Sequence, residues 1–286
     1  MDDVPARVDV VVVNYNGGDL LLRAVAAVLA GTVSPRLILV DNASMDGSAA
    51  EVETRFPEVV LLRNSRNLGF AAAANQGLRA GDAEFALLLN PDCLLEPDTL
   101  EQMLRVLEKH PEAGMAGCRI LNPDGGEQRG CRRELPTLAS GAGKALGRQR
   151  AMDLHLQPLP EGPQQVEAIS GAFMLLRREA IADVGLLDEG YFMHCEDLDW
   201  CRRFLDAGWK ILFVPHVEVV HHQGHCSRAV PLRVLWHKHR GMARYYRKFL
   251  AGRAGMFKSA VILPSIYGRF LILAARDALR GLVGGR

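Results

Sequence analysis

The sequence predicts an α/β fold in which helices flank a doubly wound, mostly parallel sheet, followed by a helical C-terminal tail. Nearly unbroken β-branched runs, such as VDVVVV at residues 8–13, are typical of strands buried on both faces of a sheet. Segments with helical periodicity separate these runs, and this alternation predicts parallel strands. Beyond Pro231 the chain becomes basic and helical.

The other elements follow in regular order along the chain. Further strands are expected at 37–40, 59–62 and 85–89. Helices are expected at 20–30, from Ser48 onward, at 70–78 and at 97–109. Residues 122–165 are rich in Gly, Pro and Arg, and we expect them to form a long, loose excursion. After it we expect an apolar run at 166–176, helices at 177–184 and 195–208, and strands at 209–214 and 217–222.

Size and composition fit one large globular unit with a tail. The chain has 286 residues, of which 49% are hydrophobic and 23% charged, enough to bury a sizeable core. The formal net charge of +1 gives no indication of a nucleic-acid partner. The 6 cysteines match neither a zinc site nor a disulfide framework, which predicts reduced thiols. We expect a catalytic domain at 1–230, with a nucleotide-binding half at about 8–120 and an acceptor half at about 121–230, and a tail at 231–286.

The two ends of the chain bear on its location. The N-terminal sequence MDDVPARVDVVVVNYN lacks the features of a signal peptide, and no stretch reaches the ~20 uninterrupted apolar residues of a spanning helix. We therefore expect a cytoplasmic protein. Residues 236–253 are dense in Lys, Arg and aromatic side chains, and 256–282 are apolar with interspersed Arg, a pattern that favours contact with an anionic inner membrane face. These helices could instead pack on the catalytic domain or on a second copy in a homodimer.

Polar side chains follow the first four predicted strands at the point where each strand ends. They are Asn14 and Asn16, Asp41 and Asn42, Asn64 and Asn67, and Asn90 and Asp92. Doubly wound sheets bind ligands outside the carboxyl ends of their strands, so a binding site is expected at this edge. Arg66 and Gly69 add a cation and a small residue just before a helix, where phosphate is favoured. A tight turn before a closely packed helix is the alternative interpretation.

The residue types at these ends suit a nucleoside diphosphate and a metal. Asp92 could ligate Mg²⁺ or Mn²⁺, which would neutralise a diphosphate leaving group, although it could also simply cap a helix. Asp41 could accept a hydrogen bond from the imide N–H of uracil or thymine. His221, His222 and His225 follow a late strand; we expect one of them to contact the metal or the diphosphate, with His221 favoured and His222 its main rival.

The stretch HCEDLDW at 194–200 carries the acids Glu196, Asp197 and Asp199 at the start of a predicted helix. The helix dipole favours acids at this position, which explains part of the cluster. At least one of them should also face the strand ends, where a carboxylate could remove a proton from an attacking hydroxyl. We expect Asp197 to be this base, with Glu196 as the second candidate.

In their order along the chain, several segments resemble the family 2 glycosyltransferases, especially the rhamnosyltransferase-like branch. They are VVVNYN (11–16), VDNASMDGS (40–48), RNLGFAAAANQG (66–77), LLNPDC (88–93), SGAFMLLRREA (170–180), GLLDEGYFMHCEDLDWCRR (185–203) and HHQGHCS (221–227). The resemblance implies a GT-A fold, a nucleoside-diphosphate sugar donor and inversion at the anomeric carbon by one displacement. It assigns Asp41 to the nucleotide base, Asp92 to the metal and Asp197 to proton abstraction.

The resemblance also bears on the identity of the donor. Asn90 takes the first place of the Asp-x-Asp motif found in many relatives, and Asn-Pro-Asp is frequent in the rhamnosyltransferase-like branch. We therefore expect dTDP-L-rhamnose rather than a UDP-sugar. The full set of expected nucleotide and donor contacts is Asn14, Asn16, Asp41, Asn42, Arg66, Asn67, Gly69, Asn75, Asn90 and Gly171.

These expectations describe a glycosyltransferase of the hexosyltransferase type (EC 2.4). It would act on a hydroxyl of a glycan or polyprenyl-linked acceptor in cell-surface polysaccharide synthesis. A sugar nucleotidyltransferase is an alternative, but residues 8–19 lack the basic, Gly-rich phosphate loop usual at the start of that class. A non-catalytic nucleotide- or glycan-binding module is another, although such a module has no need of acids like Asp92 and Asp197.

Overall fold

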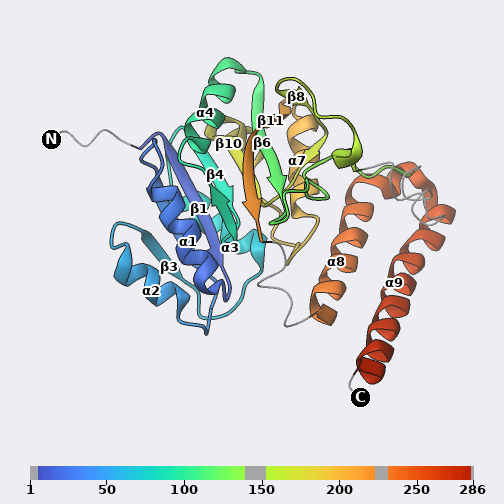
Figure 1. Ribbon diagram of the computed structural model, residues 1–286. Coiled ribbons are helices and arrows are strands. Elements are labelled where there is room, and N and C mark those ends of the chain that lie inside the picture. Colours follow the sequence, from blue (N-terminus) through green and yellow to red (C-terminus); the bar gives the residue numbers. More distant parts are fainter. Residues whose placement is uncertain (1–5, 139–152, 223–230, 285–286) are drawn as a thin grey trace.

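The computed structural model describes residues 6–138, 153–222 and 231–284, and a nine-stranded sheet forms its centre (Figure 1). Its strands are β1 (Val8–Asn14), β2 (Arg36–Asp41), β3 (Val60–Arg63), β4 (Phe85–Leu89), β5 (Cys93–Leu95), β6 (Ala113–Leu121), β8 (Gln164–Gln165), β10 (Phe173–Arg177) and β11 (Lys210–His221). The order is β3-β2-β1-β4-β10-β6-β11-β5, with β8 paired to β11. Neighbours are parallel from β3 to β4 and between β6 and β11, whereas β10 and β5 run antiparallel to their neighbours.

Helices cover both faces of this sheet (Figure 1). They are α1 (Gly18–Leu29), α2 (Ser48–Arg55), α3 (Phe70–Ala80), α4 (Thr99–Lys109), α6 (Arg178–Val184) and α7 (Glu196–Asp206). The helix α3 packs on β1 and β2, α4 on β6 and β11, and α7 on β11. Every residue of β1 and β4 is buried, as their continuous apolar sequences predict. The predicted fold class is therefore confirmed.

Two parts of the structure differ from the expectation. The central strand β6 was not expected, because its sequence AGMAGCRIL places Gly and Ala where β-branched residues usually mark a strand. Residues 122–138, expected to be loose, carry the buried side chains of Cys131, Arg132 and Leu135. Within this region β7 (Arg132–Arg133) pairs with β9 (Ala168–Ile169), and the short helix η2 (Leu154–Leu156) follows.

The topology brings the predicted polar residues to one edge of the sheet. Because β1, β2, β4 and β11 all point the same way, their last residues lie at a common edge, and β10 begins there because it runs the opposite way. Main-chain hydrogen bonds connect these ends: Asn42 N donates to Asn14 O (2.8 Å) and Asn90 N donates to Ala172 O (2.9 Å). This edge holds the candidate site.

The C-terminal tail forms two helices that lie side by side next to the α/β domain (Figure 1). They are α8 (Pro231–Tyr245) and α9 (Ala251–Gly284), joined by a π-helical turn at Tyr246–Leu250. The ring of Trp236 on α8 packs against the rings of Tyr267 and Phe270 on α9, with centroids 6.0 and 5.2 Å apart. Contrary to the expectation from sequence, one described helical segment, Leu232–Ala278, is long and apolar enough to cross a membrane by length and composition, and its apolar window is 0% buried.

Candidate active site

Asn14 connects the ends of β1 and β2 by hydrogen bonds. It is fully buried, and its Nδ2 lies 3.0 Å from Asp41 Oδ1, Ser44 Oγ and Ser48 Oγ. Its Oδ1 accepts a hydrogen bond from Gly17 N at 3.0 Å. An asparagine amide has two N–H donors, so these oxygens use them fully within the protein. Asn14 therefore positions Asp41 rather than offering a donor to a ligand.

Asp41 keeps hydrogen-bonding capacity for a ligand. Its Oδ1 accepts from Asn14 and its Oδ2 accepts from Ser44 N at 3.3 Å, whereas each carboxylate oxygen can accept two hydrogen bonds. Asn16 shapes the adjoining loop: its Oδ1 accepts from Met45 N at 2.8 Å, and its own N donates to Ser44 Oγ at 2.9 Å. The carboxylate at the end of β2 is thus held in place and can still accept from further donors.

Asn42 and Asn67 close the loop before α3. Asn42 Nδ2 donates to Asn67 Oδ1 (3.0 Å) and to Gly69 O (3.2 Å), and Asn42 Oδ1 accepts from Leu68 N (3.0 Å). Asn42 is buried, so its amide serves the protein itself. Arg66, in the same loop, is exposed and forms no ion pair with any residue that the structure describes. Of this group, Arg66 is the residue available to an anionic ligand.

Gly69 and Asn75, both expected at the donor, instead hold the segment 187–192 against α3. Gly69 has a φ of +88°, and a Cβ there would lie 2.6 Å from Phe192 O, so only glycine allows this approach. Phe70 N donates to the same oxygen at 2.7 Å. Asn75 Nδ2 donates to Leu187 O at 2.9 Å, and its Oδ1 accepts from Leu187 N at 3.0 Å.

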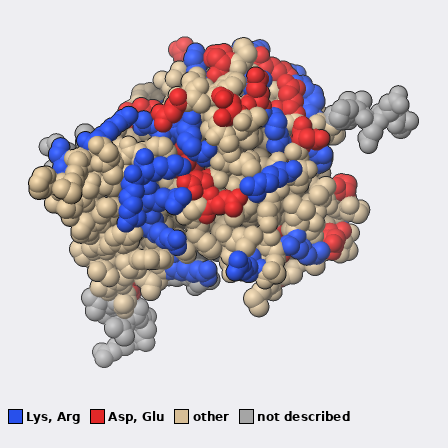
Figure 2. Space-filling view, turned by 180° about the vertical axis from the view of Figure 1, so that it is seen from behind, with Lys and Arg blue, Asp and Glu red and all other residues tan. Residues whose placement is uncertain are grey.

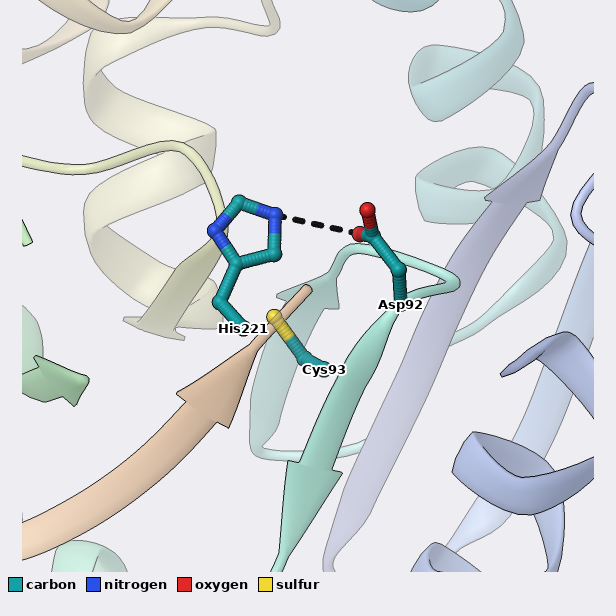
Figure 3. Close-up of side chains that lie close together, drawn as sticks. All are labelled: Asp92, Cys93 and His221. Atoms are coloured by element: carbon teal, nitrogen blue, oxygen red, sulfur yellow. Dashed lines mark ion pairs between the residues drawn. The ribbon is translucent and has the colours of Figure 1, made fainter. Parts of the chain in front are cut away.

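Asp92 faces the ring of His221 across the end of the sheet (Figure 3). His221 Nε2 lies 3.1 Å from Asp92 Oδ1, and both side chains are buried. Asn90 Nδ2 lies 3.2 Å from the same nitrogen. His222 reaches Asp92 through its main chain, because its N–H donates to Asp92 O at 2.9 Å. Of these two histidines, His221 is the one whose ring meets the carboxylate; His225 lies outside the described residues.

Gln128 fixes the tautomer of His221. Gln128 Oε1 lies 2.7 Å from His221 Nδ1, and Gln128 Nε2 donates to Asn122 Oδ1 at 3.0 Å. Because the amide nitrogen is directed at Asn122, the amide oxygen accepts from the imidazole, and Nδ1 carries the proton. His221 Nε2 then faces Asp92 and Asn90; a proton on it pairs with the Asp92 carboxylate, and without that proton its lone pair is open to a metal.

Asp92 and His221 suit a divalent metal, whereas their neighbour Cys93 does not. The ligand atoms of these residues lie within 4.8 Å of one another (Figure 3). A carboxylate oxygen suits Mg²⁺ and Mn²⁺, and the lone pair of His221 adds a nitrogen ligand. The Sγ of Cys93 instead donates to Ala172 O at 3.5 Å, and burial raises the pKa of this thiol, so it stays protonated. A carboxylate and an imidazole leave coordination positions open for diphosphate oxygens.

Asp197 lies beside Gly171, which connects it to the metal side of the edge. A Cβ built on Gly171 would lie 3.5 Å from Asp197 Cβ and 4.0 Å from its Oδ2. The next residue, Ala172, accepts the hydrogen bonds of Asn90 N and Cys93 Sγ. The first turn of α7 therefore adjoins the loop that carries Asp92, as the prediction of a shared site requires.

Arg133 keeps Asp197 ionised. Arg133 Nη2 donates to Asp197 Oδ2 at 2.5 Å, and Leu198 N donates to Oδ1 at 2.8 Å. Burial acts to raise the pKa of Asp197, but the charge and hydrogen bond of Arg133 outweigh it, and the pKa lies below its ordinary value. Asp197 is therefore a carboxylate throughout the physiological range, ready to accept a proton.

The Glu196 carboxyl, in contrast to that of Asp197, favours its protonated form. Its carboxyl is buried, and its Oε2 has no hydrogen-bond partner in the part of the chain that the structure describes. Burial, followed by repulsion from Asp197, raises the pKa of Glu196 to about 8. At pH 7 the neighbouring carboxyls thus divide into one neutral acid and one anion, which favours Asp197 over Glu196 as a base.

Glu196→Gln is expected to stabilise the protein at neutral and alkaline pH. The unfolded carboxyl loses its proton near pH 4.5 and the folded one near pH 8, so the folded state is increasingly penalised as the pH rises between these values. Glutamine removes this penalty. Scanning calorimetry should give similar melting temperatures near pH 4.5 and a variant several degrees higher at pH 8, at roughly 2–4 °C per kcal/mol. Glu179→Gln, at an exposed glutamate, is the control. A difference in melting temperature between Glu196→Gln and wild type that does not change with pH would contradict the raised pKa.

Arg133 and Gln128 were not predicted as site residues from the sequence. Both come from the Gly- and Arg-rich stretch GGEQRGCRREL, whose composition indicates a loop and not a role for any one side chain. Asp199, the remaining acid of its cluster, is fully buried and accepts from Lys248 Nζ (2.7 Å), Arg203 Nε (2.8 Å) and Tyr191 Oη (3.1 Å). It anchors α7 to the tail and is not exposed to a ligand.

Comparison with known proteins identifies relatives over nearly the whole chain. A family model described as "Glycosyltransferase like family 2" matches residues 5–246. An N-acetylglucosaminyl-diphospho-decaprenol L-rhamnosyltransferase of Mycobacterium tuberculosis (strain ATCC 25618 / H37Rv) is 33% identical over 292 residues, which cover 95% of this chain and 94% of the relative. The rhamnosyltransferase WbbL of Escherichia coli (strain K12) is 26% identical over 171 residues, covering 58% and 63%.

Solved structures with similar folds include other sugar transferases. The mannosyltransferase PcManGT from Pyrobaculum calidifontis, in complex with GDP-Man and Mn²⁺, superposes with a TM-score of 0.60 at 18% identity and covers 98% of this chain and 83% of that one. GalNAc-T7 with UDP, GalNAc and Mn²⁺ gives a TM-score of 0.57 at 19% identity, covering 77% and 44%. These likenesses show a shared fold, in agreement with the expected GT-A architecture.

Proposed function

This chain belongs to the glycosyltransferase-like family 2, and we propose that it transfers L-rhamnose from dTDP-L-rhamnose to a hydroxyl of an N-acetylglucosaminyl-diphospho-polyprenol in cell-surface polysaccharide synthesis. The observation that supports this choice of substrates is the identity of 33% with a mycobacterial L-rhamnosyltransferase of that acceptor class, which extends over 95% of the chain and so includes the tail.

The donor is proposed to bind along the ends of β1, β2 and β4. Asp41 accepts the imide N–H of thymine, since its carboxylate is fixed by Asn14 and has acceptor capacity left. Arg66 is free to pair with a phosphate. Asp92 and His221 would hold Mg²⁺ or Mn²⁺, which neutralises the charge that develops on the departing diphosphate.

The acceptor side is proposed to use Asp197 as the general base. The acceptor hydroxyl approaches Oδ1 or Oδ2 beside Gly171, which lacks a side chain that would fill this space. Asp197 takes the proton as the hydroxyl oxygen bonds to the anomeric carbon and the diphosphate leaves, so the configuration inverts in one displacement. Arg133 orients the carboxylate and keeps it ionised between turnovers.

A transfer assay tests this function directly. The purified chain is incubated with Mn²⁺, rhamnose-labelled dTDP-L-rhamnose and a short-chain prenyl-diphospho-GlcNAc in detergent, with labelled UDP-GlcNAc and UDP-glucose as competing donors. We expect a labelled disaccharide lipid from the rhamnose donor alone, and none after EDTA treatment. Transfer from a UDP-sugar in preference to rhamnose would refute the donor, and binding without turnover of any donor would refute the transferase itself.

The outer surface of α9 supports a further proposal, that the tail lies on the anionic inner face of the membrane. Phe257, Val261, Leu271 and Ile272 fall on one helical stripe at about 100° per residue and are 86%, 69%, 64% and 71% exposed. The exposed cations Lys258, Arg269 and Arg276 follow one margin of this stripe. An apolar stripe with a basic margin is the pattern of a helix that lies in the bilayer interface.

Vesicle binding tests this location. The chain should sediment with vesicles that contain phosphatidylglycerol, and Leu271→Asp/Ile272→Asp should reduce the bound fraction at least about tenfold, since two large apolar contacts are lost. Pure phosphatidylcholine vesicles, which lack net charge, serve as the control. Equal binding of variant and wild type would refute contact through this stripe, and resistance to alkaline carbonate would indicate a spanning helix instead.

A further inference from the structure

One face of α8 is turned toward the α/β domain, and it is ion-paired at only one of its ends. Arg244 Nη2 donates to Asp188 Oδ1 at 2.7 Å, and Lys248, in the following turn, donates to Asp188 Oδ2 at 2.9 Å. Arg233 and Arg240 precede Arg244 at helical spacing, so they share its side of the helix. Both are exposed, and neither forms an ion pair within residues 6–138, 153–222 and 231–284.

The end of this face without ion pairs to described residues lies against residues 192–195, which immediately precede Glu196 and the proposed base Asp197. The ring of His237 stacks on Phe192 with centroids 4.2 Å apart and an interplanar angle of 20°. Arg233 Cζ lies 5.3 Å from the centroid of the same phenyl ring. Gly241 packs so closely that a Cβ there would lie 2.6 Å from His194 O. Cations of α8 therefore adjoin residues 192–195, immediately before Glu196 and Asp197.

Positive charges of α8 add to the effect of burial on two imidazoles in this contact. Burial and then the charge of Lys238 lower the pKa of His194 to about 4. Burial, followed by the charges of Arg233 and Arg240, lowers the pKa of His237 as well. Figure 2 shows Lys and Arg side chains gathered along the boundary between the C-terminal helices and the α/β domain. Uncompensated cations beside a catalytic segment favour an anionic ligand.

We propose that Arg233 and Arg240 bind the diphosphate of the lipid-linked acceptor and so hold its sugar against Asp197. This inference rests on the proposed function. In such an acceptor a single sugar ring separates the diphosphate from the reacting hydroxyl, so its charges must lie close to the base. The proposed partners of the donor diphosphate, Asp92 and Arg66, belong to the α/β domain and not to α8. A second diphosphate site is therefore needed, and α8 supplies cations next to residues 192–195, which immediately precede Glu196 and Asp197.

The proposal is tested with acceptors that differ in their phosphates. Transfer is measured in detergent, without a bilayer, to a short-chain prenyl-diphospho-GlcNAc and to octyl β-N-acetylglucosaminide, which carries no phosphate. Arg233→Gln and Arg240→Gln should each raise KM for the diphosphate acceptor about tenfold or more, the scale of one charge-assisted hydrogen bond, with a smaller change in kcat. The preference for the diphosphate acceptor, as the ratio of the two kcat/KM values, should fall in parallel.

Arginine to glutamine at a position away from this face serves as the control. Arg253→Gln removes an exposed arginine of α9 that forms no ion pair with a described residue, and it should leave KM and the preference unchanged. Calorimetric titration with dTDP checks that each variant is folded; Arg233→Met or Arg240→Met replaces a glutamine variant that is not. An unchanged KM, or an equal loss with both acceptors, would overturn the diphosphate site. No transfer by the wild type to either acceptor would overturn the proposed function, and this inference with it.

Discussion

Asp197→Asn is expected to lower turnover at least ~10²-fold, the scale of a general base, while leaving the affinity for dTDP unchanged. Asparagine keeps the shape and the hydrogen bond from Leu198 N, but it cannot accept the proton of the acceptor hydroxyl. Asp41, the proposed partner of the nucleotide base, lies at the end of β2 and not on α7, so we expect donor binding to be independent of residue 197. Single-turnover kinetics measures the chemical step, and calorimetric titration measures nucleotide binding.

Asp206→Asn is the matched control for this loss. Asp206 ends the same helix, α7, and its carboxylate pairs with Arg202 near the surface. We expect a change of less than about twofold, because an exposed ion pair contributes little to stability. Wild-type turnover in Asp197→Asn would move the base to Glu196, and the rate of Glu196→Gln would then decide.

Asp92→Asn is expected to lower kcat about 10²- to 10³-fold, even at saturating donor and Mn²⁺, the scale on which charge stabilisation at a leaving group acts. The amide removes the anionic oxygen that a hard cation requires and leaves His221 alone as a neutral ligand. Paramagnetic resonance of free Mn²⁺, with dTDP present, measures the accompanying loss of metal affinity. The loss should exceed tenfold.

Cys93→Ala separates this effect from general damage at the same place. Cys93 is buried next to Asp92, but its sulfur donates to Ala172 O and stays a thiol. Its replacement should reduce stability through a small cavity and leave the Mn²⁺ affinity within about twofold of wild type. Equal losses of metal affinity in both variants would show that packing, rather than the Asp92 carboxylate, governs the site.

Much of this architecture was predictable because its determinants are local in sequence. The strands β1, β2 and β4 are marked by apolar runs, and the polar residues after them lie at one edge by the geometry of parallel strands. That His221 reaches Asp92 follows from the same rule, since β11 points in the same direction. These predictions needed only strand direction and residue type.

What could not be predicted depends on contacts between distant segments. β6 is a strand because its neighbours β10 and β11 pair with it, and its own Gly- and Ala-rich sequence does not favour one. Arg133 and Gln128 acquire roles only where residues 122–138 fold back on the sheet edge. Similarly, Gly69 is needed because Phe192, far along the chain, packs against it. Such pairings carry no periodicity that a single sequence can display.

A crystal structure with dTDP and Mn²⁺ would test most directly whether Asp41, Asp92 and Asp197, remote from one another in sequence, serve one reaction centre. We expect an anomalous manganese peak at the Asp92 carboxylate and the His221 ring, next to the diphosphate, with the thymine imide on Asp41 and the open face of Asp197 toward the terminal phosphate. A manganese peak away from Asp92, or a nucleotide bound at another edge of the sheet, would contradict it.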